Sequence, residues 1–262
     1  MTAPAFAFTP GDAPLLISVP HAGTDVPPAL AARMTQQGRA LADTDWWVDR
    51  LYRDLARELG AGLLVAAQSR YVIDLNRPPD GTNLYPGRPT PELVPRDTFA
   101  GEPVWQTGEA PTESEVQERL AQHWMPYHEK LQATLTALKA RHGFARLWDA
   151  HSIRGEVPRL FDGRLPDLSL GTGGGSSCAT GLRDRLGEIA ANANGYSAVL
   201  DGRFRGGYIT RHYGQPATGI DAVQLELVQA CYMDEAPPWT WQEERAARLR
   251  PVLRELLAAM AS

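Results

Sequence analysis

Short apolar runs alternate with longer amphipathic segments along the chain, and this alternation predicts an α/β protein. The apolar runs expected to form buried strands are residues 14–19, 63–67, 70–75, 145–148, 197–200 and 222–227. The segments expected to form helices are residues 29–60, 112–142, 178–193 and 241–259. No linker or internal repeat interrupts the alternation, so we expect residues 1–262 to form a single three-layer domain around a mixed, mainly parallel sheet.

The boundaries of these elements carry recognisable signals. Thr112-Glu113-Ser114-Glu115 supplies a capping residue and acidic side chains for the first turn of helix 112–142. We expect that helix to be kinked before Pro126. Residues 80–111 and 155–177 are rich in Pro and Gly and show little periodicity, so they predict two long irregular loops.

The composition is that of an ordinary soluble globular protein. The 262 residues are 43% hydrophobic and 22% charged, which suffices for a substantial core. A formal net charge of -5 offers no basic stripe, so we expect no nucleic-acid partner. No apolar run approaches the roughly 20 residues of a membrane span, and the N-terminus does not resemble a signal peptide. The only cysteines, Cys178 and Cys231, cannot form a disulfide framework, so we expect a cytoplasmic protein with no membrane partner.

Two histidines each follow an apolar run that predicts a buried strand. His21 follows residues 14–19, and His151 follows residues 145–148. In an open α/β sheet, ligands bind outside the carboxyl ends of the strands, so both imidazoles are expected at that edge. Two histidines and a carboxylate with an open position form a recurring catalytic zinc site. The pattern therefore predicts a metal centre that contains both histidines.

Several acids after His21 are candidates for the third ligand, namely Asp25, Asp43, Asp45 and Asp49. Spacing alone leaves Asp25 competitive with Asp45, and an isolated aspartate at position 43 or 45 is typical of a helix N-cap. Asp149 is interpreted instead as a partner for the outward-facing nitrogen of a metal-bound imidazole.

Glu226 is the candidate general base. It lies in the apolar run 222–227, where Gln224 and Glu226 share one face of the expected strand. Polar side chains inside a buried strand are costly unless they have partners, which favours a functional site. The alternative is an edge strand with one solvated face.

Arginines gather near the same expected edge. Asn76-Arg77 ends the run 70–75, and Arg203, Arg205 and Arg211 lie in the glycine-rich segment 201–214. Arginine binds carboxylates through a planar, bidentate fork, so this group predicts recognition of substrate carboxylates. For any one of these arginines taken alone, a surface ion pair is the simpler interpretation.

Other features favour packing over chemistry. The run Gly171–Gly175 lacks the lysine and hydroxyl of a phosphate-binding loop, so nucleotide binding is not expected. Cys178 has no flanking sequence typical of a nucleophile. His123 and His128 lie in helix 112–142 among aromatic residues and are interpreted as packed or hydrogen-bonded side chains.

A series of short segments then completes the sequence pattern. In chain order they are Ser18–Gly23, Asp43-Thr44-Asp45-Trp46, Ser69–Pro79, Trp148–Ser152, Gly202–Gly207, Thr210–Gly214 and Gln224-Leu225-Glu226. Their combination resembles the N-formylglutamate amidohydrolases from about residue 12 to residue 235.

The resemblance implies hydrolysis of N-formyl-L-glutamate to formate and L-glutamate, a step of bacterial histidine degradation. It implies a fold similar to the zinc carboxypeptidases and aspartoacylases, with Zn²⁺ or another divalent metal such as Co²⁺ as cofactor. The order of His21, Asn76-Arg77, His151 and Glu226 agrees with those relatives. The relatives carry His-x-x-Glu where this chain has Thr24, so Asp45 is preferred as the carboxylate ligand because more distant amidohydrolases share an Asp-Trp pair there.

The predicted mechanism therefore uses metal-activated water, with Glu226 as general base and Arg77 or the metal stabilising the oxyanion. Asn76 and the arginines at positions 203, 205 and 211 are expected to hold the substrate carboxylates. The alternative enzymes are another metal-dependent N-acyl amino acid deacylase and a carboxypeptidase. A non-catalytic protein that binds small acids is the alternative from another class.

Overall fold

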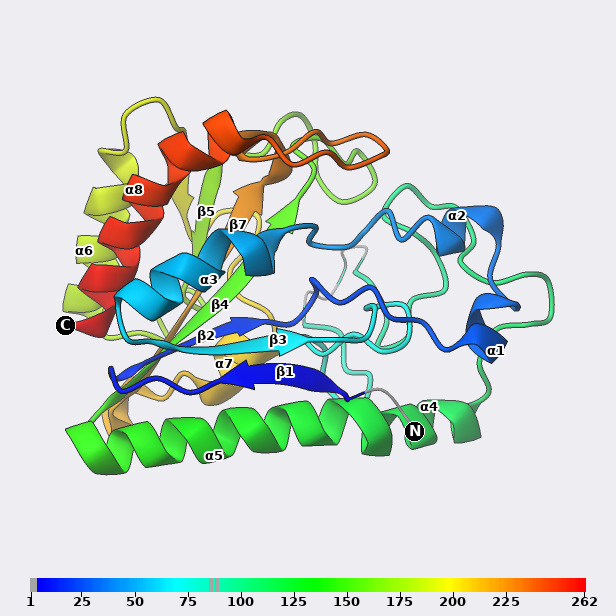
Figure 1. Cartoon of the computed structure of the whole chain (residues 1–262), viewed down its shortest axis with the longest axis horizontal. Coiled ribbons are helices and arrows are strands. Elements are labelled where there is room, and N and C mark those ends of the chain that lie inside the picture. The colour runs from blue at the N-terminus through cyan, green and yellow to red at the C-terminus, as the bar shows by residue number, and fades with distance from the viewer. Residues whose placement is uncertain (1–3, 85–86, 88–89) are drawn as a thin grey trace.

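The computed structural model describes residues 4–84, 87 and 90–262, so part of the expected loop 80–111 lies outside the described residues (Figure 1). Its centre is a seven-stranded sheet in the order β1-β3-β2-β4-β7-β5-β6. The strands are β1 Phe6–Thr9, β2 Leu15–Val19, β3 Gly62–Ala66, β4 Ala145–Ile153, β5 Leu168–Gly171, β6 Ala198–Leu200 and β7 Ile220–Val228. The β1–β3 and β5–β7 pairs are antiparallel and the remaining pairs are parallel, which confirms the predicted mixed, mainly parallel sheet.

Helices cover both faces of this sheet, as Figure 1 shows. They are α1 Pro28–Ala31, α2 Gln36–Arg39, α3 Val48–Glu58, α4 Glu113–Arg119, α5 Met125–His142, α6 Thr180–Ala191, α7 Tyr208–Tyr213 and α8 Glu243–Ala261. Helices α3, α6 and α8 pack on one face, and α5 and α7 pack on the other. Each face of the sheet has its own apolar core. Along β2, Leu15 and Ile17 pack in the core under α3, α6 and α8, and Leu16 packs in the core under α5 and α7, as the two-residue period of a strand requires.

The predicted strand over residues 70–75 is wrong. These residues form turns. The backbone N–H of Val72 donates to the carbonyl oxygen of Ser69, and the N–H of Asp74 donates to the carbonyl oxygen of Leu93. The segment is apolar and buried because its side chains belong to the core under α5 and α7, not because it pairs with a neighbouring strand. Two strands were not predicted, namely the edge strand β1 and β5, which lies within the expected loop 155–177.

The predicted single helix over residues 29–60 is also wrong, because the chain leaves the helical conformation before α3. Leu41 and Trp47 both adopt positive φ angles, 51° and 64°, which interrupt a helix. Between them the N–H of Asp45 bonds to the carbonyl oxygen of His21 at 3.0 Å. This hydrogen bond holds the segment between Leu41 and Trp47 next to the carboxyl end of β2.

The long helical segment that begins at Glu113 agrees with its prediction. Thr112 and Glu115 form a reciprocal capping box at its start. A π-helical turn over Leu120–Trp124 joins α4 to α5 immediately before Pro126, where the sequence predicted a kink. His128 is buried as expected of a packed histidine: it hydrogen-bonds with the Tyr213 hydroxyl and the Leu75 carbonyl oxygen, both at 2.9 Å.

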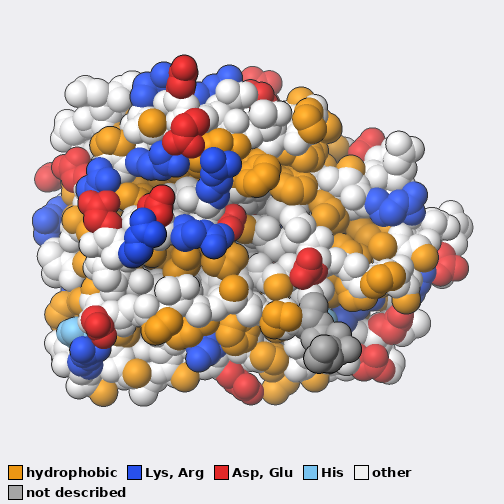
Figure 2. Space-filling view, in the orientation of Figure 1, with side chains coloured by type: hydrophobic (Ala, Val, Ile, Leu, Met, Phe, Trp, Pro, Cys, Tyr) orange, Lys and Arg blue, Asp and Glu red, His pale blue; other side chains and the backbone are white. Residues whose placement is uncertain are grey.

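On the face drawn in Figure 2, acidic and basic side chains interleave over α3 and α8. The exposed pairs Arg254–Glu58 and Arg250–Glu243 belong to this surface. Among the described residues, no helix combines the length and the apolar character needed to cross a membrane. Cys178 and Cys231 are free and buried.

Candidate metal centre

The two histidines meet at one edge of the sheet because their strands are parallel neighbours. His21 follows β2 by two residues, and β2 pairs with β4, which carries His151. β4 continues to Ile153, so His151 lies within the strand and not after it, as the sequence had suggested. The Nδ1 atoms of the two imidazoles lie 3.1 Å apart.

Asp45 joins the two histidines. Its Oδ2 atom lies 3.0 Å from Nδ1 of His151 and 3.7 Å from Nδ1 of His21. All three side chains are at most 3% exposed. Donors about 2.1 Å from a tetrahedral zinc ion lie about 3.4 Å from one another. The three donor atoms therefore have the chemistry and the spacing of a divalent metal site, and they form the one His/Cys/Asp/Glu group of this kind found among the described residues.

The other acids considered after His21 have different partners. Asp25 is exposed, and its backbone bonds to the segment that follows β3. Asp43 is buried, but its Oδ2 accepts hydrogen bonds from the Tyr71 hydroxyl and the backbone N–H of Phe99. Asp49 pairs with Arg53 on the surface of α3. Of these candidates, Asp45 alone reaches the histidines.

Carboxylates also orient the outer nitrogens of both imidazoles. Nε2 of His21 lies 2.7 Å from Oδ1 of Asp74, and Nε2 of His151 lies 3.1 Å from Oδ1 of Asp149, the partner expected from the sequence. An imidazole that donates its Nε2 proton to a carboxylate leaves Nδ1 free to bind a metal. For His21 this tautomer suits a metal between the two Nδ1 atoms, whereas Nε2 of His151 has a second polar neighbour besides Asp149.

Asn76 packs against the outer side of His151. Its Nδ2 atom lies 2.8 Å from Nε2 of His151 and 3.2 Å from Oδ2 of Asp149. The amide orientation is fixed because its oxygen accepts the backbone N–H of Ile209. If Nε2 of His151 accepts a hydrogen bond from this amide, the neutral imidazole carries its proton on Nδ1. Metal binding through Nδ1 therefore requires that Nε2 carry the proton and donate it to Asp149.

Arg70 and the role of Asp74 were not predicted from the sequence. The Arg70 guanidinium is 5% exposed, donates to Oδ2 of Asp74 at 2.6 Å and lies 3.8 Å from Oδ1 of Asp45. It therefore links the carboxylate behind His21 to the carboxylate between the histidines. The sequence offers only a weak signal, two ionisable residues on either side of the apolar residues 71–73, and this pattern also fits a strand.

The buried carboxylates of the site require compensating positive charge. Burial opposes the ionisation of Asp45, but its hydrogen bond with His151 and the nearby imidazole of His21 hold its pKa below the ordinary value. Burial also opposes the charging of His151, yet the nearby carboxylates of Asp149 and Asp45 raise its pKa well above the ordinary value. A proton on the His151 imidazole supplies one positive charge without a metal, and a divalent cation supplies two.

Glu226 lies directly beside this group. β7 is an interior strand, and its register with β4 pairs Glu226 with His151. The alternative of a solvated edge strand is therefore wrong. Gln224, on the same face, donates from Nε2 to Oε2 of Glu226 at 3.2 Å. Burial raises the pKa of Glu226 to about 8, so the carboxylate holds a proton readily in this environment.

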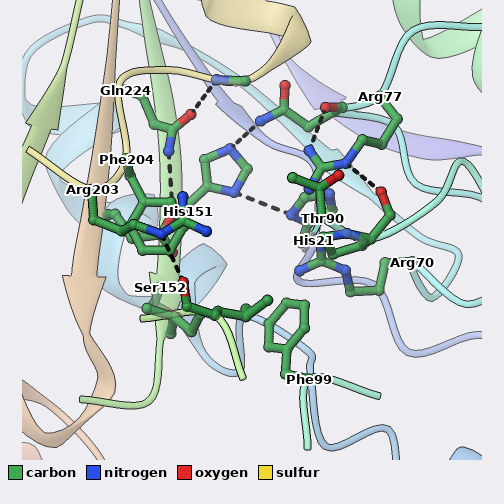
Figure 3. A pocket seen from close by; sticks show the side chains of 16 residues that line it. His21, Arg70, Arg77, Thr90, Phe99, His151, Ser152, Arg203, Phe204 and Gln224 are labelled. Atoms are coloured by element: carbon green, nitrogen blue, oxygen red, sulfur yellow. Dashed lines mark hydrogen bonds between the residues drawn. The ribbon is translucent and has the colours of Figure 1, made fainter. Parts of the chain in front are cut away.

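A cleft opens above these residues (Figure 3). Its empty volume is about 570 Å³, including the solvent at its mouth. Arg77 and Arg203 line it from opposite sides of the two histidines, as Figure 3 shows. Arg205 is exposed, and Arg211 donates to the carbonyl oxygens of Gly206 and Leu84. Neither of these two is among the residues that line the cleft.

An α/β sheet that brings two imidazoles and a carboxylate to one point, with another buried carboxylate alongside, is typical of metal-dependent hydrolases. The chain belongs to the N-formylglutamate amidohydrolase family, whose family model matches residues 13–233. It is 52% identical to the N-formylglutamate deformylase of Pseudomonas aeruginosa over 254 residues, which cover 97% of this chain and 95% of that protein. It is 50% identical to the N-formylglutamate deformylase of Pseudomonas putida, and the match covers 97% of this chain and 94% of that protein.

Two solved structures share the fold of this chain. The N-formylglutamate amidohydrolase from Ralstonia eutropha is similar to this chain with a TM-score of 0.83 and 25% identity, and the match covers 98% of each chain. A gene product from Agrobacterium tumefaciens has a TM-score of 0.75 at 16% identity, covering 98% of this chain and 94% of that one, and shares the fold.

Proposed function

We propose that the chain hydrolyses N-formyl-L-glutamate to formate and L-glutamate. The observation that carries the proposal is the position of Glu226, a buried carboxylate paired in register with His151 beside the His21–Asp45–His151 group. Relatives with about half of their residues in common with this chain are N-formylglutamate deformylases, which supports this substrate. We propose histidine degradation in the cytoplasm as its setting.

The metal is proposed to be Zn²⁺, or another divalent ion such as Co²⁺, held by His21, Asp45 and His151. The paired Nδ1 atoms and the adjacent carboxylate oxygen support this ligand set. When bound there, the metal would polarise a carbonyl oxygen and lower the pKa of water. Asp74 and Asp149 hold the two imidazoles in the tautomer that keeps Nδ1 free for the metal.

Glu226 is proposed to move the proton. It accepts a proton from the attacking water and returns that proton to the departing amino nitrogen, so one carboxylate serves as base and then as acid. A carboxylate with a pKa raised by burial is suited to both steps, because it both takes and releases a proton near neutral pH. Arg77 is proposed to stabilise the oxyanion that develops on the formyl oxygen.

Substrate recognition is proposed to depend on the two carboxylates of the glutamyl group. Arg77 and Arg203 stand on opposite sides of the histidines, which suits a ligand with an anionic group at each end. The expected contribution of Asn76 stays a prediction, since its amide contacts His151, Asp149 and the backbone of Ile209. The expected contribution of Arg205 and Arg211 stays a prediction, since both lie outside the lining of the cleft. We further propose that residues 1–262 act as one catalytic domain, because strands from both ends of the chain join the same sheet.

The decisive test is formate release from N-formyl-L-glutamate by purified protein, before chelation, after chelation and after zinc is restored. We expect activity that disappears with the chelator and returns with the metal. Inactivity of metal-loaded protein would contradict the proposal. Turnover of N-acetyl or N-carbamoyl amino acids instead would identify a different deacylase, and ligand binding without turnover across the panel would indicate a binding protein.

A further inference from the structure

Phe99 is a buried aromatic residue of the long loop between β3 and α4. The next two residues, Ala100 and Gly101, are exposed, whereas the Phe99 side chain is 8% exposed and lines the cleft. A large aromatic ring that a loop sends into a cleft must either pack there or shape the space that a ligand occupies. The contacts around Phe99 support both roles.

The backbone at Phe99 is anchored independently of its ring. The N–H of Phe99 donates to Oδ2 of Asp43 at 2.7 Å, and the same oxygen accepts the Tyr71 hydroxyl. The adjacent Thr98 carbonyl oxygen accepts a hydrogen bond from Arg159 at 2.9 Å. Because these bonds use the backbone of residues 98 and 99, a substitution of the side chain at position 99 leaves them available.

The ring lies one side chain away from the candidate metal centre. The centre of the Phe99 ring is 4.8 Å from Cζ of Arg70, and a guanidinium nitrogen of Arg70 is 3.8 Å from Oδ1 of Asp45. In Figure 3, Phe99 and Arg77 stand on opposite sides of His21 and His151. An acyl group whose oxygen faces Arg77, as proposed above, would therefore direct its remaining substituent towards Phe99.

We infer that Phe99 determines acyl-group specificity by limiting the acyl substituent to hydrogen. The inference rests on the proposed function and explains why this site would take an N-formyl group in preference to an N-acetyl group. The backbone anchor fixes the start of the side chain, and turning the ring away from the cleft would cost its contact with the Arg70 guanidinium. An extra methyl group on the acyl carbon would press against this fixed ring, and overpacking of this kind is destabilising.

The test compares Phe99→Ala and Phe99→Leu with Phe204→Ala as matched control. Phe204 lines the cleft beside Arg203, whose Cζ is 5.1 Å from its ring, on the side away from Phe99. The quantity measured is the ratio of kcat/KM for N-acetyl-L-glutamate to that for N-formyl-L-glutamate. Binding of both compounds to the same variants in a Glu226→Gln background gives the corresponding ratio of Kd values without turnover.

We expect Phe99→Ala to raise the acetyl-to-formyl ratio by about 10-fold or more, the scale on which one methyl group is discriminated, with a smaller rise for Phe99→Leu. Phe204→Ala should leave the ratio near the wild-type value. Unchanged ratios in folded, metal-containing Phe99 variants, or an equal rise in Phe204→Ala, would overturn the inference. Absence of formate release by the wild type would contradict the proposed function, while the Kd ratio would still decide the role of Phe99.

Discussion

Nδ1 of His21 and Nδ1 of His151 face each other across 3.1 Å, although 130 positions separate the two residues in the chain. Oδ2 of Asp45 lies beside both nitrogens. Each of these atoms carries a lone pair, and lone pairs converge in a buried site only around a proton or a metal ion. The parallel pairing of β2 with β4 brings the histidines together, and the loop between α2 and α3 supplies the acid.

Replacing Asp45 by Asn should remove most of the bound metal and nearly all activity. The amide keeps the size of the carboxylate but loses its negative charge, which the divalent ion needs in a site with two neutral histidines. Metal content after dialysis, measured by elemental analysis, checks this expectation. Asp25→Asn is the matched control, because Asp25 is exposed and is not part of the donor group; equal metal loss in both variants would refute the ligand assignment.

Replacing Asp74 or Asp149 by Asn should weaken metal binding by about 10- to 100-fold while leaving the fold intact. Each carboxylate orients an imidazole that it contacts through Nε2, so its loss frees the ring to rotate or to change tautomer. Competition with a chromophoric chelator measures the affinity. Asp49→Asn, on the surface of α3, serves as control, and unchanged affinity in both site variants would show that the contacts do not orient the ligands.

The two histidines and Glu226 could be predicted from the sequence because each depends on a local pattern. A polar residue at the end of an apolar run, or within one, has few explanations other than a buried site. The choice of Asp45 over Asp25 and Asp43 depended on a resemblance, because spacing alone left these acids equivalent. Only the tertiary fold separates them, through the positive φ angles at Leu41 and Trp47 that end the helical path.

Arg70 and Asp74 show why the remainder of the site could not be predicted. The residues between them are apolar, which in sequence is indistinguishable from a strand, yet the chain folds there in turns that direct both charges towards His21 and Asp45. Strand pairing and core packing bury apolar residues equally well, so hydrophobicity cannot tell them apart. The same limit explains why Arg205 and Arg211 could not be separated from Arg203 by sequence.

Glu226→Gln should retain the metal and lower kcat by about 10²- to 10⁴-fold, the usual contribution of a general acid–base group. Glutamine preserves the size of the side chain but cannot accept a proton from water. Steady-state kinetics combined with metal analysis distinguish loss of the base from loss of the site. Activity close to that of the wild type would remove Glu226 from the mechanism.

Arg203→Ala should weaken the preference for a substrate with a side-chain carboxylate. Arg203 lines the cleft, so its removal should raise KM for N-formyl-L-glutamate and narrow the gap between that compound and N-formyl-L-leucine. Arg205→Ala is the matched control, since the side chain at position 205 is exposed. If both variants changed selectivity equally, Arg203 would have no special part in recognising the carboxylate.

His128 should make the stability of the protein sensitive to acid. Burial lowers the pKa of His128 from 6.5 to about 4 in the folded protein, while in the unfolded chain it keeps its ordinary value. As the pH falls, the unfolded chain therefore binds this proton first, so stability declines between pH 6.5 and about 4 and the contribution is constant outside that window. The loss amounts to roughly 3 kcal/mol for a shift of this size.

His128→Gln removes the titration but keeps a donor for the Leu75 carbonyl oxygen. The variant is expected to be less stable at neutral pH, because the stacking of His128 on Trp124 is lost. The informative quantity is therefore the slope of the free energy of unfolding against pH, measured by denaturant titration of metal-free protein. A shallower slope than wild type between pH 6.5 and about 4 is expected, and identical slopes would mean that His128 is already charged in the folded state or is neutral in both states.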